Sequence, residues 1–213
     1  MISEPETAEA AAITIDQPIL LIDPGHGGAD GGAVSADGQI ESGINLDIAS
    51  RLHSLCTFLG VPSRLTRDSE KLCYPPELQT LSAMKKWDTH ARVELINRTE
   101  NAVLLSIHQN FYPSPGPCGA QTFYAPTAGS AAFSGIVQKK LTETLCPGNR
   151  RLSSPAEESI YIMSHVTCPA VLVECGFLSN PEEAAKLTDS TYQIKLAAVL
   201  AASYLQYQEE SYL

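Results

Sequence analysis

The stretch ILLIDPGHGG, residues 19–28, places four consecutive apolar residues directly before a loop rich in proline and glycine. An apolar run without polar alternation is typical of a strand that is buried on both faces of a sheet. Asp23, Pro24 and Gly25 end the run abruptly, because these residue types favour turns. We therefore predict a buried strand over residues 19–22, followed by a loop that carries His26.

The residues after this loop predict a helix and a second strand. Apolar side chains recur at spacings of 4, 4, 3 and 4, the period of an amphipathic helix, at Ile44, Ile48, Leu52, Leu55 and Leu59. Gly60 stands where a helix-ending glycine is common, and residues 61–66 return as a strand. A strand, helix and strand in this order build a parallel sheet.

The rest of the chain continues this alternation of strands and helices. We predict strands at residues 103–107, 119–125, 159–163 and 170–173, and helices at residues 84–97, 130–144 and from near Pro181 and Thr191. The predicted fold class is α/β, a single domain with a central, mostly parallel sheet flanked by helices on both faces. This domain spans residues 18–213 and follows an N-terminal tail of residues 1–17.

Composition restricts the classes of partner. The chain has 14 basic and 24 acidic residues, a net charge of −10, which argues against nucleic acid or an anionic membrane as the main partner. No apolar stretch is long enough to span a membrane, and no signal peptide is recognisable at the start. The six cysteines include no CxxC pair, so a zinc ribbon or a thioredoxin-like site is disfavoured, and we expect most of them to be buried free thiols.

Two histidines occupy equivalent places at the ends of predicted strands. His26 lies in the loop after the first strand, and His108 directly follows the strand 103–107. Ligands of such sheets bind beyond the carboxyl ends of the strands, so the two imidazoles can converge although 82 residues separate them. Either histidine alone is more often a hydrogen-bonded structural residue.

Two carboxylates are candidates for the same region. Glu41 begins the first predicted helix, where the helix dipole favours a carboxylate even without a metal. Together with His26 and His108 it also gives three ligands and an open fourth position, as in catalytic zinc sites. Glu174 follows an entirely apolar strand, and burial suits it to be either an acid/base beside a metal or the partner of a basic residue.

The other histidines are weaker candidates. We expect His53 to be a partly buried structural residue of the first helix. His90 belongs to a polar helical stretch with Asp88 and Arg92, which we interpret as a solvated face. His165 remains a candidate pocket residue.

Four segments together resemble a known enzyme family. They are residues 22–28 (IDPGHGG), Glu41, residues 106–110 (SIHQN) and residues 173–180 (VECGFLSN). In this order they resemble the zinc-dependent N-acetylmuramoyl-L-alanine amidases of the amidase_3 type. The resemblance runs from about Ile19 to Leu205, nearly the whole chain.

The resemblance implies roles for the residues selected above. His26, Glu41 and His108 would be the zinc ligands and Glu174 the catalytic acid/base. Zn is the implied cofactor, and Asn110 is a candidate for orienting the substrate. The implied reaction is hydrolysis of the amide between N-acetylmuramic acid and L-alanine in peptidoglycan.

Softer signals place the chain nearest to the germination-specific spore-cortex branch of the family. These are GAQTFY at residues 119–124 and FLSNPEE at residues 177–183. The branch implies remodelling of spore cortex towards muramic lactam. Cys175 and Gln109 depart from the pattern we expect, although neither removes a ligand. No inserted helix that would block the site is recognisable and no wall-binding repeat is appended, so targeting or activation calls for a protein partner.

The substrate implies a location in the cell envelope, outside the cytoplasmic membrane, with a leader or anchor that is not visible in this chain. Two alternatives stay open. The first alternative is another zinc peptidoglycan hydrolase, such as a stem-peptide peptidase. The second is a catalytically silent module that binds peptidoglycan. The intact set of His26, Glu41, His108 and Glu174 argues against the silent module.

Overall fold

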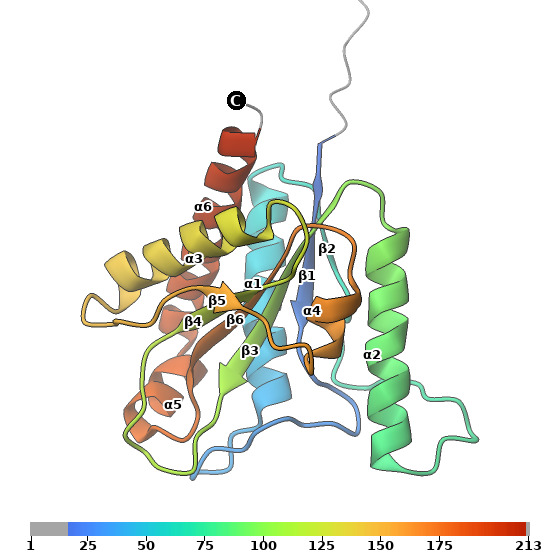
Figure 1. Ribbon diagram of the computed structural model, residues 1–213. Coiled ribbons are helices and arrows are strands. Elements are labelled where there is room, and N and C mark those ends of the chain that lie inside the picture. The colour runs from blue at the N-terminus through green and yellow to red at the C-terminus, as the bar shows by residue number, and fades with distance from the viewer. Residues whose placement is uncertain (1–16, 212–213) are drawn as a thin grey trace, which may run out of the picture.

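The computed structural model describes residues 17–211, in which six strands form one sheet in the order β2-β1-β3-β6-β4-β5 (Figure 1). The strands are β1 (Ile19–Pro24), β2 (Ser63–Leu65), β3 (Ala102–Asn110), β4 (Gln121–Tyr124), β5 (Ser154–Pro155) and β6 (Ala170–Phe177). β1, β2, β3 and β6 run parallel, whereas β4 runs antiparallel to β6 and parallel to β5. The predicted mostly parallel α/β sheet is confirmed.

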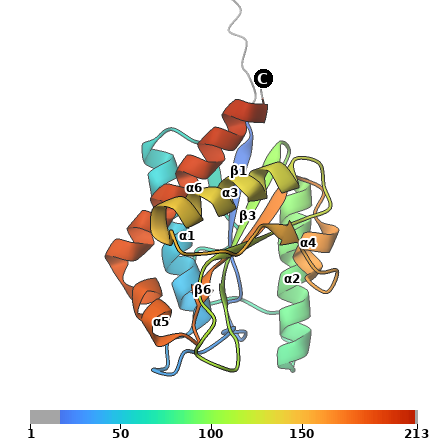
Figure 2. The ribbon, with the colours of Figure 1, turned by 60° about the vertical axis from the view of Figure 1, so that its left-hand side comes forward.

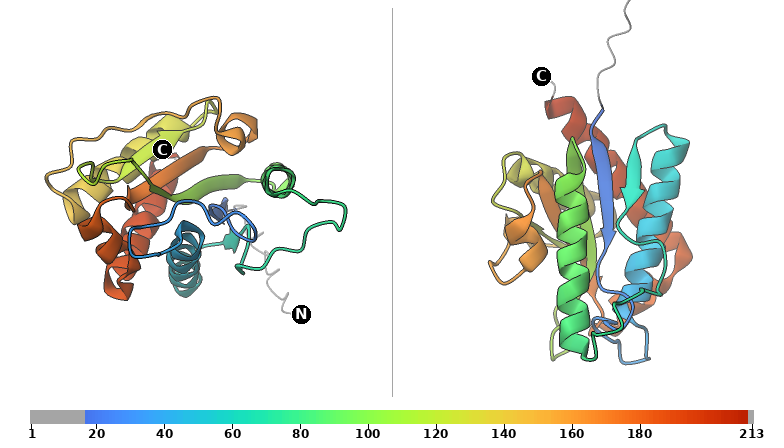
Figure 3. Two further views of the ribbon diagram at one scale, coloured as in Figure 1. Left: turned by 90° about the horizontal axis from the view of Figure 1, so that it is seen from below. Right: turned by 90° about the vertical axis from the view of Figure 1, so that its right-hand side faces the viewer.

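Helices cover both faces of this sheet. They are α1 (Glu41–Phe58), α2 (Leu81–Arg98), α3 (Ser130–Leu145), α4 (Tyr161–His165), α5 (Pro181–Thr188) and α6 (Ser190–Ser211). Helices α1, α3, α5 and α6 pack on one face, and α2 and α4 pack on the other (Figure 2). The right panel of Figure 3 shows α1 and α2 on opposite sides of β1. None of the helices within residues 17–211 combines the length and the hydrophobicity that a membrane span requires.

Alternation along the strands decides which face carries the polar residues. Leu104 of β3 and Leu172 of β6 belong to the core under α2 and α4, whereas their neighbours Leu105 and Val171 belong to the core under α1, α3 and α6. Successive side chains of a strand point to opposite faces. Positions 108 and 174 therefore lie on the α2/α4 face, at the carboxyl ends of their strands.

One predicted strand is wrong. Residues 159–163 were expected to form a strand, but α4 occupies Tyr161–His165 and the outer strand β5 is only Ser154–Pro155. Ile162 and Met163 are neighbours and both are buried. A turn of helix can bury two consecutive side chains against one surface, whereas a strand at the sheet edge would turn one of them away. This explains why an apolar run that looks like a strand becomes helical.

Most other predicted elements are found within a few residues of their expected bounds. Asn180 caps α5 as predicted by accepting hydrogen bonds from the N–H groups of Glu182 and Glu183. All six cysteines are free, but only Cys56 and Cys175 are buried, so the expectation that most are buried is wrong. The predicted tail lies, apart from residue 17, outside the described residues.

Candidate active site

The loop after β1 brings His26 over the end of β3. His26 has a φ of 61°, a left-handed conformation that is uncommon outside glycine, and Gly27 and Gly28 also have positive φ. Gly25 continues the pairing with β3, because its N–H donates to the carbonyl of Ile107 over 2.9 Å. A Cβ on Gly25 would lie 2.2 Å from the imidazole of His108. Only glycine at this position lets the loop pass so close to the His108 ring.

Glu41 is the first residue of α1 and is 3% exposed. Its Oε2 accepts a hydrogen bond from the backbone N–H of Ala33 over 2.8 Å, and its Oε1 accepts one from the N–H of Gln109 over 3.0 Å. A Cβ on Gly32 would lie 2.4 Å from Oε2, so glycine is needed there too. The carboxylate is thus held between the loop that precedes α1 and the end of β3.

His26, Glu41 and His108 converge on one point. Oε1 of Glu41 lies 3.3 Å from Nε2 of His26 and 3.2 Å from Nδ1 of His108. The two imidazole rings are 4.9 Å apart and nearly perpendicular. One ligand atom from each of the three residues lies within 4.8 Å of the others. Two imidazoles and a carboxylate with such spacing could hold a metal ion, and this donor set is one that zinc accepts.

Asp30 supports this cluster from behind. Its Oδ2 lies 2.9 Å from Nδ1 of His26 and 2.9 Å from Nζ of Lys85. The hydrogen bond directs Nε2 of His26 towards Glu41 and His108, as carboxylates do for metal-binding histidines. Burial lowers the pKa of His26, but the hydrogen bonds to Asp30 and Glu41 outweigh this and raise its pKa to about 9. The cluster therefore attracts positive charge to the place where the three ligand atoms meet.

Glu174 lies beside the cluster. It is opposite His108 in the register of β3 and β6. Oε2 of Glu174 is buried and has no hydrogen-bond partner among the described residues. Burial raises the pKa of Glu174 to about 7, with Glu41 adding to this effect and the two histidines opposing it. A carboxyl that titrates near neutrality is suited to accept and return a proton.

Two buried arginines hold the histidine-bearing loop. Arg67 donates to the carbonyls of Pro24 and Gly25 over 2.9 and 3.0 Å. Arg92 donates to the carbonyls of Pro24 and His26. Sequence reasoning missed these roles, and the interpretation of Arg92 as part of a solvated face is wrong because it is only 6% exposed. The signal was present in Asp23, an acidic residue at the end of a buried strand, which requires a cationic partner.

Asp23 is the counterion of Arg92 and holds together the side chains around the end of β1. It is 1% exposed and accepts hydrogen bonds from Thr66 Oγ1, Ser106 Oγ and Arg92 Nη1 over 2.6, 2.7 and 3.0 Å. Burial alone would raise its pKa, but Arg92 and the two hydroxyl groups hold it below its ordinary value. The charge of Asp23 is thus fully partnered, in contrast to that of Glu174.

A cleft of about 360 Å³ opens from the cluster between α2 and α4. Its lining includes His26, Lys85, Arg92, Tyr161 and Glu174. The left panel of Figure 3 shows this carboxyl edge of the sheet from below, with the loop after β1 lying across it. The cleft is open to solvent at the edge where the sequence places its candidate residues.

The remaining predicted residues have other surroundings. His165 does not line the cleft but stacks on one face of Tyr161, with ring centroids 3.8 Å apart, and His90 stacks on the other at 4.4 Å. His53 is half-buried and bonded to Ser63 Oγ, as expected for a structural residue. Asn110 ends β3, where its carbonyl accepts from the N–H of Leu178.

Comparison with known proteins agrees with the geometry. A profile of the N-acetylmuramoyl-L-alanine amidase family matches residues 20–204. The chain belongs to this family. The germination-specific N-acetylmuramoyl-L-alanine amidase of Bacillus subtilis is 35% identical over 200 residues, which cover 93% of this chain and 83% of the relative.

Solved structures show the same fold. The CwlD amidase of Clostridioides difficile, solved in complex with the GerS lipoprotein, has a TM-score of 0.86 and 33% identity and covers 91% of this amidase and 99% of that chain. The N-acetylmuramoyl-L-alanine amidase of Clostridium difficile 630 has a TM-score of 0.78 and 26% identity, over 91% of this amidase and 97% of that chain. The chain is therefore an amidase whose substrate is peptidoglycan.

Proposed function

We propose that this amidase is zinc-dependent, with His26, Glu41 and His108 as the metal ligands and Glu174 as the catalytic acid/base. The observation that carries the proposal is the convergence of three ligand atoms within 4.8 Å beside a buried carboxyl that has no hydrogen-bond partner among residues 17–211. Asp30 strengthens it, because a carboxylate behind a metal-binding histidine is the usual support for such a site.

Hydrolysis then divides between the metal and the protein. When bound, zinc supplies a Lewis acid that polarises the scissile carbonyl and lowers the pKa of water. Glu174 accepts the proton of the attacking water and delivers it to the departing nitrogen of L-alanine, a role supported by its burial, which raises its pKa to about 7 when no metal is bound. Arg67 and Arg92 keep the loop of His26 in place, and Asn110 orients the substrate near His108.

The biological role we propose is remodelling of spore cortex towards muramic lactam. The germination-specific relative of Bacillus subtilis, matched over 93% of this chain, supports this role. The complex of the Clostridioides difficile amidase with a lipoprotein supports a protein partner that targets or activates the enzyme. Because peptidoglycan lies outside the cytoplasmic membrane, we place the enzyme in the cell envelope.

The test is mass spectrometry of peptidoglycan digested with zinc-loaded protein. Wild-type protein should release stem peptides that begin with L-alanine and leave unsubstituted glycan. Glu174→Gln should bind zinc equally well by elemental analysis and release nothing, whereas Glu158→Gln, at an exposed glutamate, should behave as wild type. Cleavage within the stem peptide would instead identify a peptidase, and tight binding of muropeptides without any turnover would identify a silent binding module. Activity of Glu174→Gln would refute its assignment as the acid/base.

A further inference from the structure

The row of polar side chains at the carboxyl edge of the sheet continues beyond Glu174. Gln121, the first residue of β4, is paired with Glu174 in the antiparallel ladder with β6. Thr122 points to the other face, where its hydroxyl donates to the carbonyl of Ser134 in α3. Gln121 therefore shares the face of Glu174, since neighbouring side chains of a strand alternate. Along this edge, His108, Glu174 and Gln121 follow one another on β3, β6 and β4.

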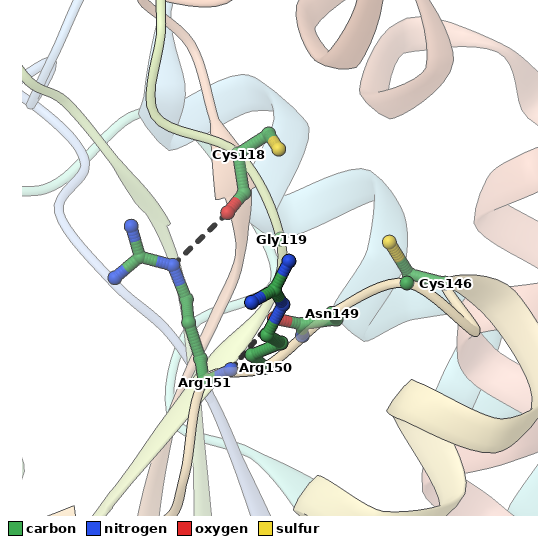
Figure 4. A pocket seen from close by; sticks show the side chains of 7 residues that line it. Cys118, Gly119, Cys146, Asn149, Arg150 and Arg151 are labelled. Carbon is green, nitrogen blue, oxygen red and sulfur yellow. Dashed lines mark hydrogen bonds between the residues drawn. The ribbon is translucent and has the colours of Figure 1, made fainter.

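Arg151 extends the row by one more side chain. Its Nη1 donates to Oε1 of Gln121 over 3.0 Å. Its Nε donates to the carbonyl of Cys118 over 3.0 Å, the bond drawn from Arg151 to Cys118 in Figure 4. The guanidinium also covers the ring of Phe177, at 4.5 Å from the ring centroid. These three contacts fix the plane of the guanidinium. Fixing it in advance reduces the entropy that binding an anion would cost.

The guanidinium retains unused hydrogen-bonding capacity. Within residues 17–211, Nη2 of Arg151 forms no hydrogen bond, and no carboxylate forms an ion pair with Arg151. The nearby carboxylate of Glu183 is occupied by the backbone N–H groups of Gly119 and Phe177, over 2.9 and 2.8 Å. Arg151 is half-exposed beside an open hollow of about 500 Å³ that lies after the end of α3 and before the start of β4 (Figure 4). A ligand anion can therefore reach it.

The chemistry of the reaction decides which part of the substrate passes this point. Glu174 must come within hydrogen-bond reach of the leaving nitrogen, which belongs to the peptide side of the scissile amide. The three metal ligands lie on the other side of Glu174, where the carbonyl is held. The peptide therefore continues away from His108, past Glu174 and towards Gln121 and Arg151.

We infer that Arg151, oriented by Gln121, binds a free carboxylate of the stem peptide just beyond L-alanine and so determines which peptides are accepted. This inference rests on the proposed function. An arginine matches a carboxylate with two parallel N–H groups, a geometry that an amide in its place cannot accept fully. The enzyme then distinguishes a stem peptide with a free acid at this position from the same peptide with an amide.

The experiment uses two glycan oligomers that differ only in the carboxyl group next to L-alanine, which is free in one and amidated in the other. Wild-type enzyme should cleave the free acid with a kcat/KM about tenfold higher, the size expected for one charged hydrogen bond. Arg151→Gln should raise KM for the free acid about tenfold and leave kcat unchanged. Its kcat/KM for the amidated oligomer should equal that of the wild type, so the preference for the free acid is lost. Arg151→Lys should retain part of it.

Two further variants distinguish recognition of the carboxylate by Arg151 from a loss of protein stability and from a general effect of positive charge. Arg150→Gln removes the same charge one residue away, from an exposed side chain without the Gln121 contact, and should keep the full preference. Gln121→Ala should weaken the preference although the charge of Arg151 remains. Equal losses on both oligomers in Arg151→Gln, or no loss on either, would overturn the inference. The proposed function is tested separately, by whether wild-type enzyme cleaves the bond between N-acetylmuramic acid and L-alanine in either oligomer.

Discussion

Oδ2 of Asp30 lies 2.9 Å from Nδ1 of His26, on the opposite side of the imidazole from Glu41. This single contact fixes which ring nitrogen faces Glu41, and the negative charge of Asp30 favours the protonated imidazole. Lys85 holds the same oxygen of Asp30 from the solvent side. The orientation of His26 is therefore set by a residue outside the cluster of His26, Glu41 and His108.

Replacing Asp30 by Ala should weaken zinc binding by about 10- to 100-fold, the range found for outer carboxylates of metal sites. Without the acceptor, both the tautomer and the ring orientation of His26 become free. Competition with a chromogenic chelator measures the affinity. Asp47→Asn, at an exposed position of α1, is the control and should bind zinc as wild type does. An unchanged affinity in Asp30→Ala would show that His26 is oriented by its backbone alone.

Gly25→Ala should displace His108 and abolish high-affinity zinc binding. The added Cβ would lie 2.2 Å from the imidazole, a separation that forces either the ring or the loop to move. Gly43→Ala is the matched control, because Gly43 lies within α1 and a Cβ there meets no atom within 4 Å. That substitution should raise stability by about 0.5–1 kcal/mol through helix propensity. Thermal unfolding and zinc titration of both variants distinguish steric displacement from general intolerance of alanine.

The sequence located the three residues that cluster at the edge of the sheet, because each follows directly from a strand end or a helix start. Residues 19–22 and 103–107 are apolar runs without ambiguity, so His26 and His108 were located as soon as the strands were. The same logic failed at residues 159–163, where an apolar run packs as a turn of helix. Local pattern alone does not tell which neighbouring surface will bury such a run.

The partners in long-range polar contacts were also beyond sequence reasoning, although Asp23 indicated that some cationic partner was needed. Arg92 lies 69 positions from Asp23 in the sequence. Only three residues of α2 are buried, Arg92, Val93 and Ile96, and the mostly polar sequence of this helix does not indicate that its arginine is one of them. The contact of Arg151 with Gln121 spans 30 positions and joins a loop to a strand. Such pairs depend on the order of strands in the sheet, which periodicity does not reveal.

Glu174→Gln should stabilise the metal-free protein at alkaline pH. Burial raises the folded-state pKa of Glu174 from its ordinary 4.5 to about 7. The stability that its carboxyl contributes is fully present below pH 4.5 and is lost as the pH rises through 7, because the folded state must then release a proton that it binds more tightly than the unfolded state does. The loss amounts to about 3 kcal/mol at most.

Glutamine keeps the shape and never ionises, so the gain of the variant should be small at pH 5 and largest at pH 8. Urea unfolding in the presence of a chelator at both pH values measures it. With zinc bound, the difference should shrink, because a nearby cation favours the ionised carboxylate. A gain that is equal at pH 5 and pH 8 would mean that Glu174 is not held against ionisation, and its role as the acid/base would lose its physical basis.

Arg92→Met should cost about 3–5 kcal/mol of unfolding free energy, because it leaves Asp23 ionised and buried without its cationic partner. The double variant with Asp23→Asn should recover part of this loss, although the carbonyls of Pro24 and His26 stay without their donor. Since Arg92 holds the pKa of Asp23 below its ordinary value, removing Arg92 raises that pKa, and the difference from wild type should narrow as the pH falls towards 4. Denaturant unfolding of the four proteins in a double-mutant cycle gives the coupling energy. Strict additivity of the two substitutions would mean that Arg92 contributes through its contacts with Asp88 and with the loop carbonyls and not through Asp23.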